Sequence, residues 1–330
     1  MTAQKLTLAC WDHDRAAAIL DGRVKVRGAD IASTVLPTSK LYPIAANEAR
    51  FDITEMSVST YILQLSKSET PYTAIPVFLS RAFRHNGFFA RTGAGIETPA
   101  DLAGRRVGVP EYQMTAGLWM RGIMSDEYDV DLSGIHWRTG ALDAAVRKER
   151  LALALPPEIV VEPIADGETL QNLLLAGDID AILAPAPPRA FREGDPRIFR
   201  LFPDFETAER AYYEKTGFFP IMHLVAVRRS ATELNPDLPR ALYDAFSEAK
   251  ALAVDRILQV WQGSANRLTL PWLGATMERT LKTMGEDYWS YGFSANKAEL
   301  KAICRYSAEQ HLSARCVTAE EMFHASVLNT

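Results

Sequence analysis

Many charged and hydrogen-bonding residues follow the ends of predicted strands. In an open α/β sheet, ligands bind beyond the carboxyl ends of the strands. The segments after five predicted strands contain these candidates for binding or catalysis: Asp12, His13, Glu55, Ser57, Arg81, Arg84, His85, Tyr112, Gln113, Thr115 and Arg189. Surface loops are commonly polar, so each residue taken alone also has a purely structural interpretation.

Arg81 and Arg84 are candidates for holding an anionic substrate. A guanidinium group can hold a carboxylate through two parallel hydrogen bonds. His85 follows directly and completes a compact cationic group. The alternative for either arginine is a salt bridge between domains or a solvated position in a loop. Arg15 lies on a predicted helix and is interpreted as a surface or interface residue.

Tyr112, Gln113 and Thr115 stand at the predicted start of a helix. The free N–H groups at a helix start attract anions, which makes these residues candidates for binding a carboxylate or a phenolic oxygen. The alternative is that Thr115 simply caps the helix. Both can hold together, because a helix start has several unpaired donors.

His85, His223 and Glu55 are the candidates for moving protons. His223 opens a strand of apolar residues, where a lone histidine is usually structural, but it lies near a predicted crossing between domains. A desolvated, unpaired Glu55 would have a raised pKa and could donate a proton. A paired Glu55 would instead neutralise a neighbouring cation.

The residue spacing predicts no metal and no cofactor. The chain contains no phosphate-binding glycine-rich loop, no nucleophile elbow and no HExxH motif. Asp12, His13, Glu55 and His85 could be combined into a divalent metal site, but their spacing does not predict one. Cys10, Cys304 and Cys316 have no paired spacing, which argues against disulfides and a zinc site.

The elements that must position these residues alternate between strands and helices. This alternation predicts an α/β fold with mostly parallel sheets. Strands are expected at 6–10, 51–55, 74–78, 88–90, 106–109, 180–184 and 223–227, a capped turn at 98–104, and helices at 15–20, 115–124, 170–175 and 238–253. Ser57 is a candidate cap for the helix that follows it.

The chain of 330 residues is long enough for two domains. No linker is visible, so strands must cross between the domains, near 84–89 and again near 216–223. One lobe is therefore expected to contain residues 1–86 and 221–330, with a helical C-terminal extension, and the other residues 87–220. The C-terminal helices are a candidate surface for a homo-oligomer.

Charge and hydropathy exclude several classes of partner. The net charge is −5 with acidic and basic residues well mixed, which argues against a nucleic-acid partner. No segment has the roughly 18 consecutive apolar residues of a membrane span. The first residues lack the apolar run of a secretion signal, so a cytoplasmic location is expected.

Two stretches resemble the type 2 periplasmic-binding-protein superfamily. They are DLAGRRVGV at 101–109 and LAGDIDA at 175–181. Four more stretches resemble the 4,5-dihydroxyphthalate decarboxylase family: FDITEMS at 51–57, PVFLSRAFRH at 76–85, VPEYQMTA at 109–116 and FPIMH at 219–223. That family often reads Asp-Tyr-Asp-Arg near its start, whereas this chain has His13 in place of the tyrosine.

The resemblance implies a two-lobed fold, each lobe a mostly parallel sheet flanked by helices, with a cleft between the lobes. It also implies an enzyme that removes one carboxylate from a dihydroxylated aromatic dicarboxylate, without an organic cofactor, to give protocatechuate. Arg81, Arg84 and the helix start at Thr115 would hold the substrate. His85, His223 and Glu55 would transfer protons.

Two alternatives share this fold. One is a non-catalytic solute-binding protein for a small aromatic or carboxylate ligand, of the kind that serves an ABC transporter. It would need export. The other is a pyrimidine-precursor synthase of thiamine biosynthesis, whose family is marked by a cysteine-rich cluster that this chain lacks.

Overall fold

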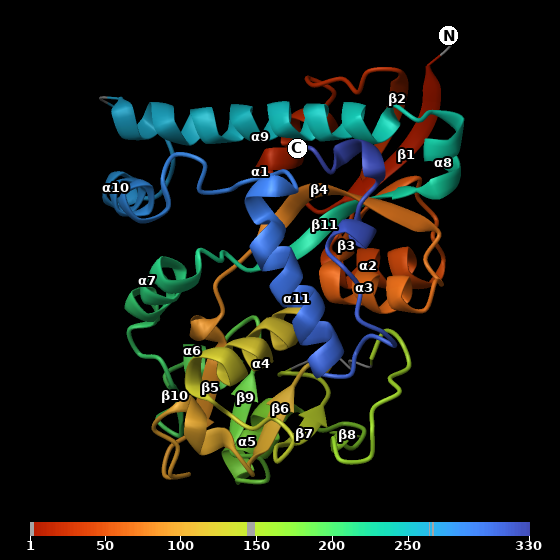
Figure 1. Cartoon of the computed structure of the whole chain (residues 1–330). Coiled ribbons are helices and arrows are strands. Elements are labelled where there is room, and N and C mark those ends of the chain that lie inside the picture. The colour runs from red at the N-terminus through yellow and green to blue at the C-terminus, as the bar shows by residue number, and fades with distance from the viewer. Residues whose placement is uncertain (1–2, 144–148, 264, 266) are drawn as a thin grey trace.

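A computed structural model describes residues 3–143, 149–263, 265 and 267–330, and contains two β-sheets (Figure 1). The first sheet has the strand order β2-β1-β3-β11-β4. Its strands are β1 (Gln4–Cys10), β2 (Ala29–Val35), β3 (Ile53–Ser57), β4 (Tyr72–Arg81) and β11 (Ile221–Arg228). Strand β11 runs antiparallel to both β3 and β4, whereas β1 is parallel to β2 and β3. The carboxyl ends of β1, β3 and β4 therefore lie at the same edge as the first residues of β11.

The second sheet has the order β10-β5-β9-β6-β7-β8. Its strands are β5 (Phe88–Arg91), β6 (Arg106–Val109), β7 (His136–Thr139), β8 (Val161–Pro163), β9 (Ala181–Leu183) and β10 (Ile198–Arg200). Strands β6, β7, β8 and β9 are parallel, and β5 is antiparallel to its neighbours. The chain passes between the sheets after β4 and returns before β11. The exact domain boundaries stay a prediction.

Helices cover both sheets. The α-helices are α1 (Asp14–Leu20), α2 (Thr38–Asn47), α3 (Val58–Ser66), α4 (Thr115–Tyr128), α5 (Leu170–Ala176), α6 (Arg189–Arg192), α7 (Phe205–Thr216), α8 (Arg229–Leu234), α9 (Leu238–Gln262), α10 (Leu273–Met284) and α11 (Lys297–Glu309). Short 3₁₀ segments are η1 (His85–Gly87), η2 (Pro99–Leu102), η3 (Ser294–Asn296), η4 (Glu320–Met322) and η5 (Ala325–Val327). Within the described ranges, no helix has the length and apolar character needed to cross a membrane.

The sequence explains why the central elements are buried. Strand β4 reads YTAIPVFLSR, and its apolar residues are removed from solvent on both faces. Apolar residues on both faces are typical of a strand covered on both sides. The predicted capped turn is also present, because Thr98 and Asp101 form a reciprocal capping box at η2.

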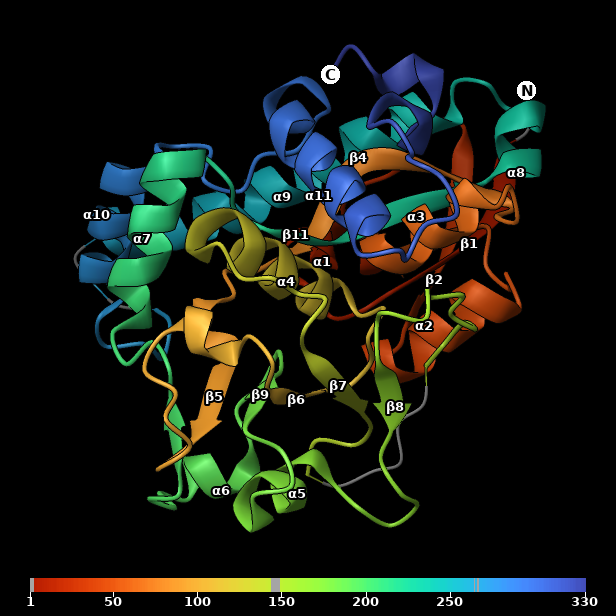
Figure 2. The ribbon, with the colours of Figure 1, turned by 60° about the horizontal axis from the view of Figure 1, so that its bottom comes forward.

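Helix α4 joins the two parts of the molecule. It packs against α3, which follows β3 of the first sheet, and against α11 near the C-terminus (Figure 2). The buried Arg121 of α4 donates from Nε to Gln310 Oε1 at 2.6 Å. The ring of Tyr306 lies directly against Gly122. Helix α11 and the residues that follow it are thus part of the packing that holds α4 in place.

Candidate active site

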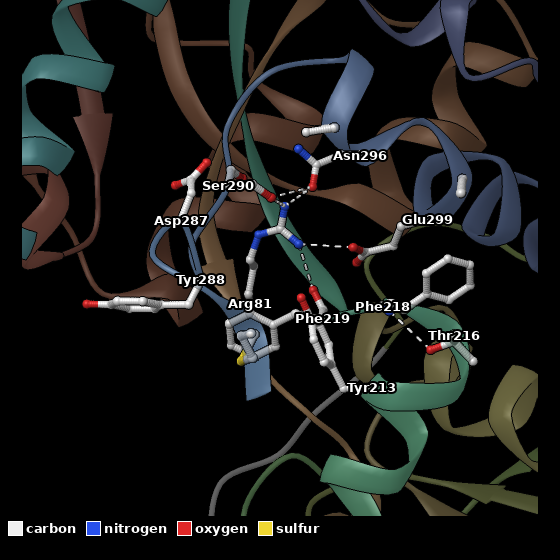
Figure 3. Close-up of a pocket in the computed structure, with 14 residues that line it drawn as sticks. Arg81, Tyr213, Thr216, Phe218, Phe219, Asp287, Tyr288, Ser290, Asn296 and Glu299 are labelled. Atoms are coloured by element: carbon white, nitrogen blue, oxygen red, sulfur yellow. Dashed lines mark hydrogen bonds and ion pairs between the residues drawn. The ribbon is translucent and has the colours of Figure 1, made fainter. Parts of the chain in front are cut away.

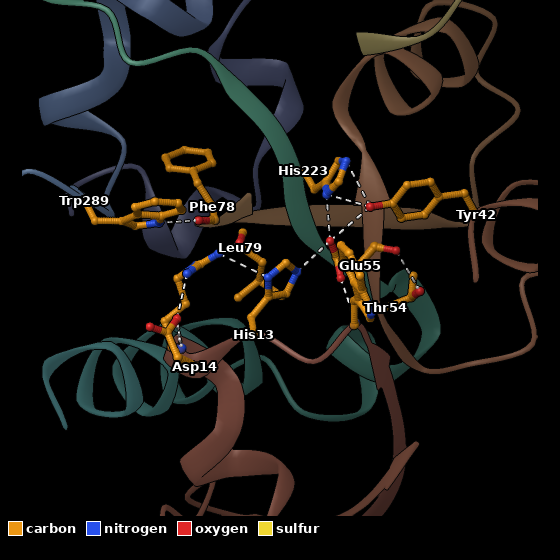
Figure 4. Close-up of polar contacts among 11 residues, drawn as sticks. His13, Asp14, Tyr42, Thr54, Glu55, Phe78, Leu79, His223 and Trp289 are labelled. Carbon is orange, nitrogen blue, oxygen red and sulfur yellow. Dashed lines mark hydrogen bonds and ion pairs between the residues drawn. The ribbon is translucent and has the colours of Figure 1, made fainter. Parts of the chain in front are cut away.

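Three polar side chains from neighbouring strands meet at one edge of the first sheet (Figure 4). His13 follows β1, Glu55 lies within β3, and His223 lies on β11 opposite Ser57 of β3. One ligand-type atom from each of the three lies within 4.8 Å of the others. Glu55 is fully buried, His13 is nearly so, and His223 is partly exposed.

Glu55 accepts four hydrogen bonds. Its Oε1 lies 3.0 Å from His13 Nε2, 2.7 Å from His223 Nδ1 and 3.0 Å from the hydroxyl of Tyr42. Its Oε2 accepts the Trp11 N–H at 2.8 Å. Burial alone would raise the pKa of Glu55, but the hydrogen bonds from the two histidines hold that pKa well below its usual value. Glu55 is therefore a paired carboxylate, and the prediction of an unpaired proton donor does not fit this position.

His223 is fixed by this carboxylate. Because Glu55 accepts at Nδ1, the proton of the neutral ring is on Nδ1 and the lone pair is on Nε2. Burial lowers the pKa of His223, and the nearby Arg84 lowers it further, although the Glu55 charge opposes both effects. A neutral imidazole with a free lone pair at Nε2 can accept a proton. The hydroxyl of Tyr42 lies 2.9 Å from that nitrogen.

Arg84 is the cation of the site. Its side chain follows β4 and is only 8% exposed. Its Nε donates to the sulfur of Met222 at 3.2 Å, and no carboxylate among the described residues is within ion-pair distance of the guanidinium. Burial lowers the pKa of Arg84 to about 10, and the negative charge of Glu209 opposes this shift. A buried cation without an anionic partner is costly, so this group is prepared to receive an anion.

Arg81 lies elsewhere and has partners (Figure 3). Its Nη1 donates to Glu299 at 3.0 Å and to the Phe219 carbonyl at 2.7 Å, and its Nη2 donates to the Ser290 carbonyl at 2.9 Å and to Asn296. Arg81 borders a cavity of about 440 Å³, but its side chain is 2% exposed. The structure therefore fits the salt-bridge alternative for Arg81 and does not fit a substrate clamp.

The predicted anion site at the start of α4 is filled by the protein itself. Met114, not Thr115, occupies the capping position. The Thr115 hydroxyl lies 2.8 Å from the hydroxyl of Ser57 and also accepts the Ser59 N–H. Ser57 therefore links β3 to α4 and makes no side-chain cap for α3.

Glu149 binds donors of the loop that precedes this helix. It accepts the backbone N–H groups of Tyr112 and Gln113, and also the Gln113 side-chain amide at 3.0 Å. Tyr112 and Gln113 are almost completely buried. These two residues consequently support the site from the interior and do not present free donors to a ligand.

The other predicted site residues lie apart from Glu55. His85 packs against Phe202 and Tyr212, and burial lowers its pKa to about 4. Asp12 is exposed next to His13. Arg189 lies on α6, which packs beside β10 of the second sheet. Its Nε lies 3.7 Å from Glu193 Oε1 in an exposed ion pair. The combination of Asp12, His13, Glu55 and His85 as a metal site is not assembled among the described residues, because the ligand atoms that come together belong to His13, Glu55 and His223.

Two contributors were missed at the level of sequence. Tyr42 lies on α2, a helix that contains Pro43 and that the pattern did not predict. Arg15 was interpreted as a surface or interface residue, and its Nη2 lies 3.1 Å from His13 Nδ1. No local pattern signals either contact, because both depend on chain segments brought together by the sheet. His13, Glu55 and His223 are the residues that could offer ligands to a metal.

The arrangement favours proton transfer on an anionic substrate. It combines a neutral histidine, a carboxylate that holds it and a buried guanidinium close enough to influence the histidine pKa. Such a set can bind a carboxylate, accept a proton from an acidic hydroxyl and return it.

Two curated proteins are similar to this chain. A 4,5-dihydroxyphthalate decarboxylase of Comamonas testosteroni is 37% identical over 333 aligned residues, which cover 100% of this chain and 99% of that protein. A 4,5-dihydroxyphthalate decarboxylase of Pseudomonas putida is 34% identical over 66% of this chain and 84% of that protein. No family model matches the chain.

Solved structures share the fold at low sequence identity. The periplasmic aliphatic sulphonate binding protein SsuA of Escherichia coli superposes with a TM-score of 0.55 at 13% identity and covers all of both chains. The alkanesulfonate-binding protein SsuA of Xanthomonas axonopodis pv. citri has a TM-score of 0.52 at 12% identity, with 98% and 99% of the two chains covered. These neighbours confirm the predicted two-lobed, type 2 periplasmic-binding-protein-like fold.

Proposed function

This chain belongs to the 4,5-dihydroxyphthalate decarboxylase family, and from that premise we propose that it converts 4,5-dihydroxyphthalate to protocatechuate and CO2. The observation that carries the proposal is Arg84, a buried guanidinium without an ion-pair partner among the described residues, close to the His223–Glu55 pair. A carboxylate of the substrate supplies the missing anion.

The substrate itself supplies the electrons for the reaction. Direct loss of CO2 would leave an aryl carbanion, which is too unstable to form. The hydroxyl para to one carboxyl-bearing carbon can lose its proton and push electron density to that carbon. That carbon gains a proton that comes from the solvent, and the C–C bond to the carboxylate then breaks with its electrons returning to the ring, so that CO2 leaves. The phenolic oxygen finally regains its proton from the group that accepted it. The net change replaces one carboxylate with one proton, so no organic cofactor is required.

Arg84, His223 and Glu55 have different proposed roles in this reaction. Arg84 holds the carboxylate that stays on the ring, through charge-assisted hydrogen bonds. His223 accepts the phenolic proton at Nε2, because Glu55 keeps its other nitrogen protonated. Glu55 stabilises the imidazolium that results. His85, Arg81 and Arg189 do not take part, because they lie outside this group.

A small aromatic carboxylate is the proposed partner, while the homo-oligomer, the absence of nucleic-acid and membrane partners, and the cytoplasmic location stay predictions. The reaction as written uses no metal, which is also a prediction.

The direct test is product formation by the purified protein. We expect 4,5-dihydroxyphthalate to give equal amounts of CO2 and protocatechuate, with and without a chelator. Phthalate has no hydroxyl group to supply electrons and is expected to remain unchanged. Turnover lost to the chelator would contradict the metal-free mechanism. Tight binding without product would favour the solute-binding alternative.

A further inference from the structure

Arg15 is fixed beside the site by contacts on several sides. Its Nε donates to the Leu79 carbonyl at 2.8 Å, and its Nη1 lies 2.7 Å from Asp14. Its guanidinium lies 3.9 Å from the ring centroid of Trp289, and Trp289 is itself held by a hydrogen bond to the Phe78 carbonyl (Figure 4). The remaining nitrogen, Nη2, lies 3.1 Å from His13 Nδ1.

This contact determines the tautomer of His13. A guanidinium group only donates hydrogen bonds, so His13 Nδ1 must be the acceptor and carry no proton. The single proton of the neutral ring then resides on Nε2, where it is donated to Glu55 at 3.0 Å. His13 is thereby a hydrogen-bond donor to the carboxylate that also holds His223.

The same tautomer opposes metal binding. His13, Glu55 and His223 have the composition of a two-histidine, one-carboxylate metal site, and their ligand atoms lie close together. A histidine that binds a metal through Nε2 must offer a lone pair there and hold its proton on Nδ1. In this structure that proton would point at the Arg15 N–H donor. Two donors facing each other at 3.1 Å repel.

We propose that Arg15 is a positioning residue that locks His13 in the Nε2–H tautomer, so that the group formed by His13, Glu55 and His223 holds protons and not a divalent metal. The consequence for catalysis rests on the proposed function, but the tautomer and the metal affinity do not. Loss of Arg15 frees Nδ1 to carry the proton and opens the three side chains to a metal.

The tautomer is measured in the unmodified protein. We expect ¹⁵N NMR of histidine-labelled protein to show an unprotonated Nδ1 and a protonated Nε2 for His13, assigned by comparison with the His13→Gln variant. A protonated Nδ1 in the unmodified protein would overturn the proposal. This measurement needs no change at Arg15 and no decarboxylase activity, so it stands even if the proposed function fails.

Metal affinity is measured by titration with Co²⁺ alone, whose visible spectrum reports nitrogen and oxygen ligation. Residues that hydrogen-bond to the ligands of a metal change the metal affinity by about 10- to 100-fold. We therefore expect Arg15→Met to bind Co²⁺ at least about tenfold more tightly than the unmodified protein, and the added His13→Gln change to remove the gain. Arg23→Met is the control, because Arg23 is exposed and, among the described residues, pairs with Asp21 alone. Equal Co²⁺ affinity in the unmodified and Arg15→Met proteins would contradict the proposal.

Discussion

Glu55 is the residue through which both histidines of the site are connected. It has no solvent exposure, yet its two oxygens accept four hydrogen bonds. The charge is tolerated in the interior because both carboxylate oxygens accept hydrogen bonds, three at Oε1 and one at Oε2. A neutral side chain of the same shape would keep the space filled but would lose this role.

We expect Glu55→Gln to lower kcat by about 10²–10⁴-fold, because the neutral amide cannot stabilise the His223 imidazolium and, if its oxygen accepts from the histidines, its NH2 group faces the Trp11 N–H donor. Steady-state kinetics on 4,5-dihydroxyphthalate checks this, with circular dichroism to show that the fold is retained. A well-folded Glu55→Gln protein within a few-fold of the unmodified kcat would contradict the assignment.

His85 is a buried residue, and its burial leads to a prediction about stability. Burial lowers its pKa from 6.5 to about 4, so the unfolded chain takes up a proton at a higher pH than the folded protein does. Stability is therefore fully present above pH 6.5 and is lost progressively as the pH falls toward 4.

Replacing His85 with phenylalanine removes this titration. We expect urea unfolding of His85→Phe to show a shallower loss of stability between pH 6.5 and 4 than the unmodified protein, with turnover retained at neutral pH. Identical pH dependence in the two proteins, or loss of turnover in a folded His85→Phe protein, would contradict the structural role.

At the scale of elements, the strands with strong apolar runs were predictable from sequence. Predicted strands overlap β1, β3, β4, β5, β6, β9 and β11, because each places consecutive apolar residues in a covered sheet. The missed strand β2 alternates between half-buried and exposed residues at the edge of the first sheet, so its apolar signal is weak. The missed helix α2 contains Pro43, which masks helical periodicity and with it the position of Tyr42.

The packing of α4 on α11 makes a second element-scale prediction. Glycine to alanine normally stabilises a helix interior by up to about 1 kcal/mol. At Gly122, however, an added Cβ would lie 2.5 Å from the Tyr306 ring. We expect Gly122→Ala to lower the free energy of unfolding by about 1–3 kcal/mol through overpacking, measured by chemical denaturation.

Gly274 of α10 is the matched control, because its added Cβ would meet only Trp261 at 3.8 Å. Gly274→Ala is expected to be neutral or slightly stabilising. Gly122→Ala with unchanged or increased stability would show that α11 does not pack on α4 as described.

At the scale of the whole molecule, sequence alone could not assign Arg81. Its four partners come from the crossing before β11 and from the C-terminal segment, which the residue pattern described only as helical. Arg84, three residues away, has no such partners among the described residues. The difference between a structural and a substrate-binding arginine is thus set by segments more than 130 positions distant, as with Phe219.

We expect Arg81→Met to destabilise the protein by about 3–5 kcal/mol at pH 8, because it leaves a buried carboxylate without its cation. Burial raises the pKa of Glu299 to about 7, and Arg81 opposes that rise. Removing Arg81 raises the pKa further, so the loss should be larger at pH 8 than at pH 6, where Glu299 is protonated.

Denaturant unfolding at the two pH values tests this, with Arg240→Met as the control. The Arg240–Asp244 pair is about half exposed and is expected to contribute less than about 1 kcal/mol. An Arg81→Met protein as stable as the control variant would contradict the structural role of Arg81 and make it a candidate for substrate binding again.

The most direct test of the central claim compares Arg84→Met with Arg189→Met in turnover of 4,5-dihydroxyphthalate. We expect kcat/KM to fall by about 10- to 100-fold or more for Arg84→Met, the range expected for hydrogen bonds to a charged group, and to stay unchanged for Arg189→Met. We also expect Arg84→Met to be at least as stable as the unmodified protein, because a buried cation with no ion-pair partner among the described residues is removed. A stable Arg84→Met protein with unmodified kcat/KM would show that Arg84 does not bind the substrate carboxylate.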